Sequence, residues 1–142
     1  MVTAVTLNSI HEGIGIVRAA QQIGIPIVLS FTVETKGCLI SGETLQEVIE
    51  TIDKATDQGP TYYMINCAHP SHFMPFLKSC PSSPSSFLSR IGGVRANASR
   101  KSHAELDESD ELDDGNPEEF GNEYCELLDL LPRVNVFGGC CG

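Results

Sequence analysis

The chain has 142 residues, of which 41% are hydrophobic and 20% charged, which is enough for one domain with its own core. Nine Lys and Arg against nineteen Asp and Glu give a net charge of −10, which argues against binding nucleic acid or an anionic membrane, because both need clustered positive charge. No apolar run reaches the roughly 20 residues of a membrane-spanning helix and no export signal is evident, so we expect a soluble, cytoplasmic protein.

The first elements predict a strand, a helix and a second strand. Val2–Leu7 is short, apolar and β-branched, as in a buried strand. Ser9 with Glu12 three residues later has capping-box spacing, so we expect a helix that starts there and stops at Gly24. Ile27–Val33 is the second strand candidate.

The pattern then repeats. We expect Ser41 to cap a second helix whose apolar stripe ends before Gly59. Tyr62–Ile65 is the third strand candidate, and Asn66 and Cys67 follow at its carboxyl end.

The second half is less regular. Pro70–Lys78 predicts a short helix, and the Pro/Ser-rich stretch Cys80–Ser86 predicts no regular structure. Arg90–Asn97 is a weak strand candidate with two central glycines, and Ala98–Pro117 reads as a long acidic surface loop.

The chain closes with one more helix and strand. Glu118–Leu131 has helical periodicity, and Val134–Phe137 is the last strand candidate. The sequence Gly138-Gly139-Cys140-Cys141-Gly142 follows it directly.

Alternating strands and helices predict an α/β fold with parallel strands. The strand starts are about 33 residues apart, close to the roughly 31 per unit of a (β/α)₈ barrel. Five strands would form a partial barrel over residues 1–142, and a doubly wound open sheet is the competing architecture. No glycine-rich phosphate loop follows the first strand, so the nucleotide-binding version of the open sheet loses its main support.

The acidity is a local feature. Eleven of the nineteen acidic residues lie between Glu105 and Glu126, where no Lys or Arg occurs. We interpret this run as a solvated loop that leads into a helix, because the spacing from Asp107 to Asp114 lacks the pattern of a calcium-binding loop.

Three of the six cysteines stand where parallel strands end, which is where functional residues collect in such folds. They are Cys67, Cys140 and Cys141. Three thiolates suit Zn²⁺ and leave a fourth position for a substrate, although buried or incidental thiols remain the alternative. Both adjacent cysteines can bind one ion only if the backbone turns sharply there, which Gly138, Gly139 and Gly142 permit.

Three motifs of the chain are distinctive: Met64-Ile65-Asn66-Cys67, Arg95-Ala96-Asn97-Ala98-Ser99 and the terminal Gly-Gly-Cys-Cys-Gly. They resemble the zinc-dependent homocysteine S-methyltransferase family, which includes betaine-using and S-methylmethionine-using members. The resemblance also includes Ser30–Thr35 and covers essentially the whole chain.

The resemblance implies a (β/α)₈ barrel in which Cys67, Cys140 and Cys141 hold Zn²⁺ and homocysteine sulfur takes the fourth position. The thiolate would accept a methyl group from S-methylmethionine, S-adenosylmethionine or betaine, giving methionine. Asn66 would orient the amino acid, support the site or cap a turn, and Glu34 would contact the substrate ammonium or be a solvated carboxylate. The four histidines are expected to be structural.

The sequence also departs from the family. The first three βα units have no counterpart, so we expect a truncated barrel with about strands four to eight. Its exposed edges would favour self-association. The alternative function is a non-catalytic zinc-binding module that lacks a donor pocket.

Overall fold

The computed structural model describes residues 1–81 and 86–140. Its parallel strands form one sheet in which the order in space equals the order in sequence. The strands are β1 (Val2–Leu7), β2 (Ile27–Phe31), β3 (Tyr62–Asn66), β4 (Ile91–Ala96) and β5 (Val136–Gly139). A doubly wound sheet reverses its strand order partway, so the sequential order confirms the partial-barrel prediction.

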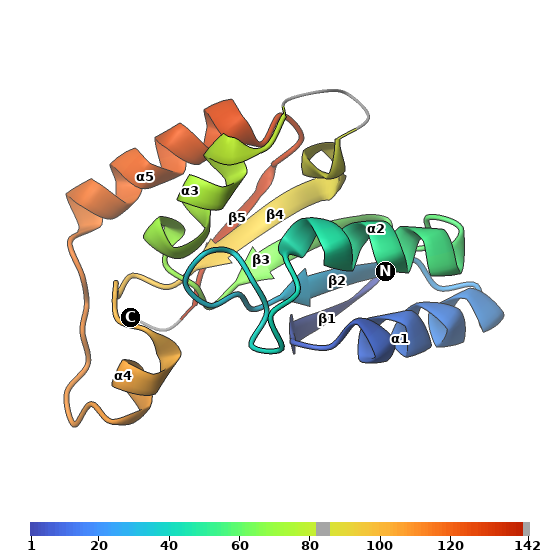
Figure 1. Cartoon of the computed structure of the whole chain (residues 1–142), viewed down its shortest axis with the longest axis horizontal. Helices are drawn as coiled ribbons and strands as arrows, with labels where there is room; N and C mark the ends of the chain where they lie inside the picture. The colour runs from blue at the N-terminus through green and yellow to red at the C-terminus, as the bar shows by residue number, and fades with distance from the viewer. Residues whose placement is uncertain (82–85, 141–142) are drawn as a thin grey trace.

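Four of the helices gather on one side of the curved sheet, as Figure 1 shows, because successive right-handed crossovers place them there. They are α1 (Ile10–Gln22), α2 (Leu45–Thr56), α3 (Pro70–Ser79) and α5 (Pro117–Leu130). The short α4 (His103–Asp107) lies beyond the carboxyl ends of the strands, and the 3₁₀ turn η1 (Phe87–Arg90) directly precedes β4. No helix in the described part of the chain has the length and apolar composition needed to cross a bilayer.

The core lies between the sheet and these helices. All five residues of β2 are buried, and α2 contributes the apolar stripe Val48, Ile49 and Ile52. The helix α1 approaches closely at Gly13, where an added Cβ would lie 2.9 Å from the Cδ1 atom of Ile52. A larger residue at this position would therefore require the end of the Ile52 side chain to move.

Several element boundaries differ from the sequence-based expectation, among them the end of β2, which lies at Phe31 instead of Val33. Ser41 does not cap α2: Thr44 does, in a reciprocal capping box with Glu47. The side chain of Ser41 instead hydrogen-bonds Glu43. Both residues are good helix caps, so only the local backbone decides between them.

The last strand is shifted two residues toward the C-terminus. It begins at Val136 and continues through Gly138 and Gly139, which pair with Arg95 and Ala96 of β4. Neither glycine has a positive φ, so the turn expected there does not occur at these two residues. Cys141 and Gly142 lie outside the described residues.

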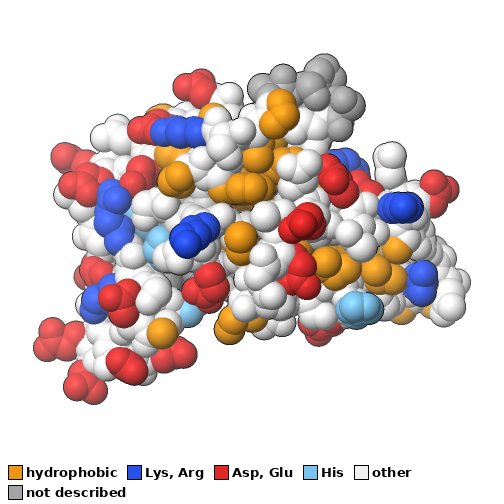
Figure 2. Space-filling view, viewed as in Figure 1, with side chains coloured by type: hydrophobic (Ala, Val, Ile, Leu, Met, Phe, Trp, Pro, Cys, Tyr) orange, Lys and Arg blue, Asp and Glu red, His pale blue; other side chains and the backbone are white. Residues whose placement is uncertain are grey.

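The acidic segment 98–117 contains α4 and is thus not an uninterrupted loop. Ser102 and Glu105 form a capping box at the start of this helix. The Oγ atom of Ser99 donates to the Oδ2 atom of Asp113 over 2.6 Å, which fixes one end of the segment to the other. Figure 2 shows the acidic side chains gathered over α4 and the start of α5.

Candidate functional site

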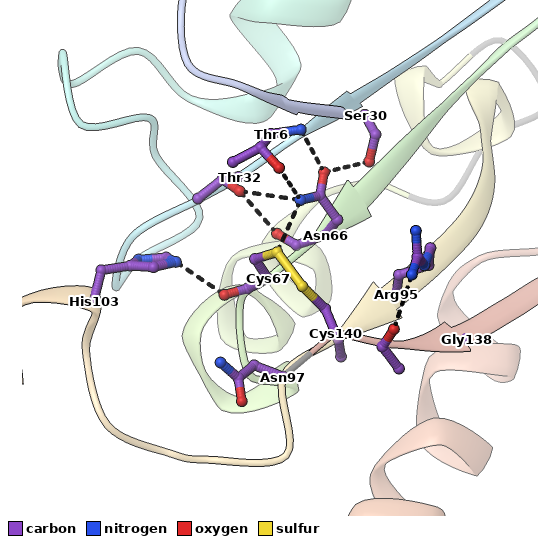
Figure 3. The surroundings of a disulfide bond; sticks show 12 residues. Thr6, Ser30, Thr32, Asn66, Cys67, Arg95, Asn97, His103, Gly138 and Cys140 are labelled. Atoms are coloured by element: carbon purple, nitrogen blue, oxygen red, sulfur yellow. Dashed lines mark hydrogen bonds between the residues drawn. A yellow bond between two sulfur atoms is a disulfide. The ribbon is translucent and has the colours of Figure 1, made fainter. Parts of the chain in front are cut away.

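Two of the three cysteines singled out from the sequence meet at the carboxyl edge of the sheet. Cys67 directly follows β3, and Cys140 directly follows β5. Their sulfur atoms form a disulfide, with Cα atoms 5.3 Å apart and 73 positions between them in sequence (Figure 3). Two of the three predicted ligand residues are thus adjacent in space, although β4 lies between their strands.

The backbone of each cysteine is held by β4. The N–H of Cys67 donates to the carbonyl of Arg95 and that of Cys140 to the carbonyl of Ala96, both over 3.0 Å. Cys67 has φ +57°, a left-handed conformation that is uncommon for a residue with a side chain. The position of the Cys67 sulfur thus depends on this left-handed backbone conformation, which contacts with neighbouring residues must stabilise.

Asn66 is buried beneath Cys67 and links the first three strands (Figure 3). Its Oδ1 atom accepts from the backbone N–H of Thr6 (3.1 Å) and the hydroxyl of Ser30 (2.5 Å). Its Nδ2 atom lies 3.0 Å from the Thr6 hydroxyl, 3.3 Å from that of Thr32 and 3.1 Å from the sulfur of Cys67. These contacts favour a supporting role for Asn66 among the roles considered from the sequence.

Glu34, just beyond the end of β2, pairs with a histidine that sequence reasoning had left as structural. Its Oε1 atom lies 2.8 Å from the Nδ1 atom of His103, and the two side chains are about one-third exposed. The Nε2 atom of His103 lies 2.9 Å from the carbonyl oxygen of Cys67. The histidine thereby joins α4 to both predicted site residues.

A cavity of about 320 Å³ opens beside Cys67, between the sheet and the acidic segment. Its wall combines hydroxyl, amide and carboxylate groups with two leucines. The lining residues are Thr6, Thr32, Cys67, Asn97, Ser99, His103, Leu106, Asp107, Leu112 and Asp113. Apart from Cys67, these residues were not predicted as site residues, and the capping box at Ser102 was the available signal that this segment folds.

A second titratable pair lies behind the site and packs α3 against α5. The Nε2 atom of His69 is 3.2 Å from the Oε2 atom of Glu123, which also contacts Arg100 at 2.8 Å through its other oxygen. Burial lowers the pKa of His69 to about 4 and raises the pKa of Glu123. The histidine is therefore neutral at neutral pH, which suits a packed interface.

The cysteine sulfur atoms fit zinc chemically, because thiolates are among its preferred ligands. Two sulfur atoms already converge, and a metal would require them as separate thiolates. In residues 1–81 and 86–140 no group of three Cys, His, Asp or Glu side chains is arranged to hold a metal ion. The expected third ligand, Cys141, lies outside the described residues.

The remaining cysteines do not share this location. Cys38, Cys80 and Cys125 are free thiols on other parts of the chain. Burial raises the pKa of Cys80, which makes it a poorer thiolate at neutral pH. These three residues fit the structural or surface roles expected from the sequence.

Comparison with known proteins finds similarity to an enzyme family and to solved structures. A family model described as homocysteine S-methyltransferase matches residues 1–142. The crystal structure of the apo form of the homocysteine methyltransferase MmuM from Escherichia coli is similar in fold, with a TM-score of 0.61 at 14% identity. The match covers 98% of this chain and 44% of that one. The search of curated proteins finds no match.

Proposed function

The chain belongs to the homocysteine S-methyltransferase family, and we propose that it contributes the zinc and homocysteine site of a methyltransferase. The observation that carries the proposal is the meeting of Cys67 and Cys140 at the carboxyl edge of the sheet, although β4 lies between their strands. The chain spans 44% of the length of the solved methyltransferase that it resembles, so the activity is proposed for the site and not inferred from the whole fold.

Cys67, Cys140 and Cys141 would hold the zinc ion as thiolates. Bound zinc would supply one property, the deprotonation of a coordinated thiol whose free pKa is near 8.5. The amide of Asn66 donates to the Cys67 sulfur over 3.1 Å, an interaction that favours the thiolate and fixes its direction.

The cavity beside Cys67 would receive the rest of the amino-acid substrate. It contains hydroxyl and amide groups for a carboxylate and the carboxylates of Asp107 and Asp113 for an ammonium group. Glu34 does not line the cavity but contacts its lining residue His103 through Oε1. Its other carboxylate oxygen would be available to a substrate ammonium. The volume of about 320 Å³ is large enough to hold homocysteine.

The net reaction would move a methyl group from a sulfonium or quaternary ammonium donor to homocysteine sulfur. The homocysteine thiol loses its proton to solvent, and its sulfur forms a bond to the methyl carbon. The carbon–sulfur or carbon–nitrogen bond of the donor breaks, and its electron pair stays on the donor, which loses its positive charge. The donors with such a cationic methyl group are S-methylmethionine, S-adenosylmethionine and betaine. The acidic wall of the cavity suits all three, because each carries a cationic centre.

Zinc analysis combined with a methionine assay tests the proposal. The reduced full chain should bind about one zinc ion and form methionine from homocysteine with one of the three donors. The C140S variant should lose zinc and activity, whereas the C125S variant should keep both, because Cys125 is exposed on α5. Zinc binding without turnover would instead support the non-catalytic module, and less than one zinc ion per several chains would overturn both proposals.

A further inference from the structure

The contact between His103 and the backbone of Cys67 is not used by the proposed reaction. The Nε2–H of His103 donates to the carbonyl oxygen of Cys67 over 2.9 Å, as Figure 3 shows. The other ring nitrogen faces Glu34 at 2.8 Å. A capping box at Ser102 fixes the backbone directly before this histidine. The ring therefore lies between the Glu34 carboxylate and one peptide group, to which it is hydrogen-bonded.

That peptide group is the one whose position matters for the sulfur. Cys67 has φ +57°, and a left-handed conformation costs roughly 1–2 kcal/mol for a residue with a side chain. Its N–H is already bound to the carbonyl of Arg95. The hydrogen bond from His103 holds the carbonyl on the other side of the same residue, so the two bonds together fix the direction of the Cα–Cβ bond.

We propose that His103 is a positioning residue that holds Cys67 in the left-handed conformation in which its sulfur reaches the sulfur of Cys140. The acidic segment 98–117 then has a structural role, because it places the His103 ring next to the end of β3. The inference deepens the proposed zinc site and rests on it for the identity of the metal. The sulfur–sulfur geometry itself can be tested without metal.

Two substitutions of His103 separate its ring nitrogens. In H103Q the side-chain nitrogen occupies nearly the place of Nε2 and can still donate to the carbonyl of Cys67. In H103N the side-chain nitrogen lies near the place of Nδ1, so it can reach Glu34 but not Cys67. H103A removes both contacts. The proposal requires that H103Q resemble the wild type and that H103N resemble H103A.

The first measurement is zinc affinity, by competition with a chromophoric chelator on the reduced full chain. We expect H103A and H103N to bind zinc about 10- to 100-fold more weakly, as is typical when a group that orients a metal ligand is lost. H103Q should stay within about threefold of the wild type. Thermal unfolding of each variant shows whether the fold is intact.

The second measurement needs no metal. In chelator-treated protein, glutathione disulfide takes two electrons and two protons from the Cys67 and Cys140 thiols, which yields the protein disulfide and two molecules of glutathione. Peptide mass mapping at equilibrium gives the fraction of the Cys67–Cys140 bond. We expect the equilibrium constant to fall at least about threefold in H103A and H103N, but not in H103Q.

The two measurements separate failure of this inference from failure of the proposed function. If the wild type binds no zinc but the disulfide equilibrium follows the expected order, the positioning role stands and the zinc function falls. If the wild type binds zinc and all three variants match it in both measurements, the positioning role is overturned and the zinc function stands. Equal losses in H103Q and H103A also overturn it, because the role assigned is that of Nε2.

Discussion

Asn66 on β3 forms two hydrogen bonds with Thr6 on β1, although β2 lies between these strands. The Oδ1 atom accepts from the Thr6 N–H over 3.1 Å, and the Nδ2 atom lies 3.0 Å from the Thr6 hydroxyl. Thr6 has φ +61° and lies where the pairing register between β1 and β2 shifts, between Ala4 and Leu7. The amide of Asn66 therefore bonds the backbone of β1 within this irregularity.

The N66A variant should unfold about 2 kcal/mol more easily, because it leaves the buried hydroxyl of Ser30 and the partly buried N–H of Thr6 without their partner. Urea denaturation measures the difference. The N135A variant, at an exposed position before β5, serves as the control and should stay within about 0.5 kcal/mol of the wild type. Equal stability of the two variants would contradict the role given to Asn66.

Zinc and the Cys67–Cys140 disulfide should exclude each other, because both use the same two sulfur atoms. We expect the zinc-loaded chain to resist oxidation by glutathione disulfide and the chelator-treated chain to form the bond. Peptide mass mapping under non-reducing conditions detects it. Formation of the disulfide at the same rate with and without zinc would refute a shared site.

Asp53 of α2 holds Arg90 of η1 and the hydroxyl of Tyr63 together. The Nε and Nη2 atoms of Arg90 lie 2.7 and 3.0 Å from the carboxylate, and the tyrosine hydroxyl lies 2.8 Å from it. Burial and this hydrogen bond raise the pKa of Tyr63, which stays a donor at any ordinary pH.

The D53N variant should therefore lose about 2–3 kcal/mol of unfolding free energy, since the mostly buried guanidinium loses its counter-ion. The value is below that of a fully buried pair because both side chains retain some exposure. Chemical denaturation of D53N beside D129N, which alters an exposed carboxylate of α5, gives the comparison. A D53N chain as stable as D129N would show that the ion pair is dispensable.

The capping box of α2 should contribute to acid sensitivity. Hydrogen bonds from the N–H and hydroxyl of Thr44, each 2.8 Å, hold the pKa of Glu47 below its usual 4.5. Because the folded-state pKa is the lower one, the contribution to stability is present above about pH 4.5 and is lost as the pH falls through the folded-state value.

The E47Q variant keeps an acceptor for the Thr44 N–H but does not titrate, so its stability should fall less steeply below about pH 4.5. Urea midpoints from pH 7 to pH 3 measure the slope. The E50Q variant, one turn further along α2, controls for the loss of one exposed carboxylate. If the stability of E47Q fell with pH as steeply as that of the wild type, the prediction would be wrong.

Self-association through the sheet edges stays a prediction. The edge strands β1 and β5 carry Val5 and Phe137, which are 49% and 47% exposed. A charged side chain on an edge strand disfavours pairing with another chain, so V5K and F137K should shift sedimentation toward monomer. Identical concentration dependence in the wild type and both variants would argue against association through these edges.

The sequence by itself determined the alternation of strands and helices and the positions of the cysteines. The capping-box spacing at Ser9 and the stop at Gly24 located α1, and apolar periodicity located α5, each to within a residue or two at its ends. Such patterns failed locally at Ser41 and at the start of β5, where neighbouring residues have similar propensities and tertiary pairing selects between them.

Only the tertiary structure decided which groups surround Cys67. Glu34, Asn66 and His103 come from three elements, and no local pattern links a histidine at the start of α4 to a peptide group 36 residues earlier. Parallel strands bring their carboxyl ends to one edge, so the sequence could indicate that Cys67 and Cys140 meet. Side-chain contacts across that edge depend on how the acidic segment folds back over it, which is set by long-range hydrogen bonds and not by composition.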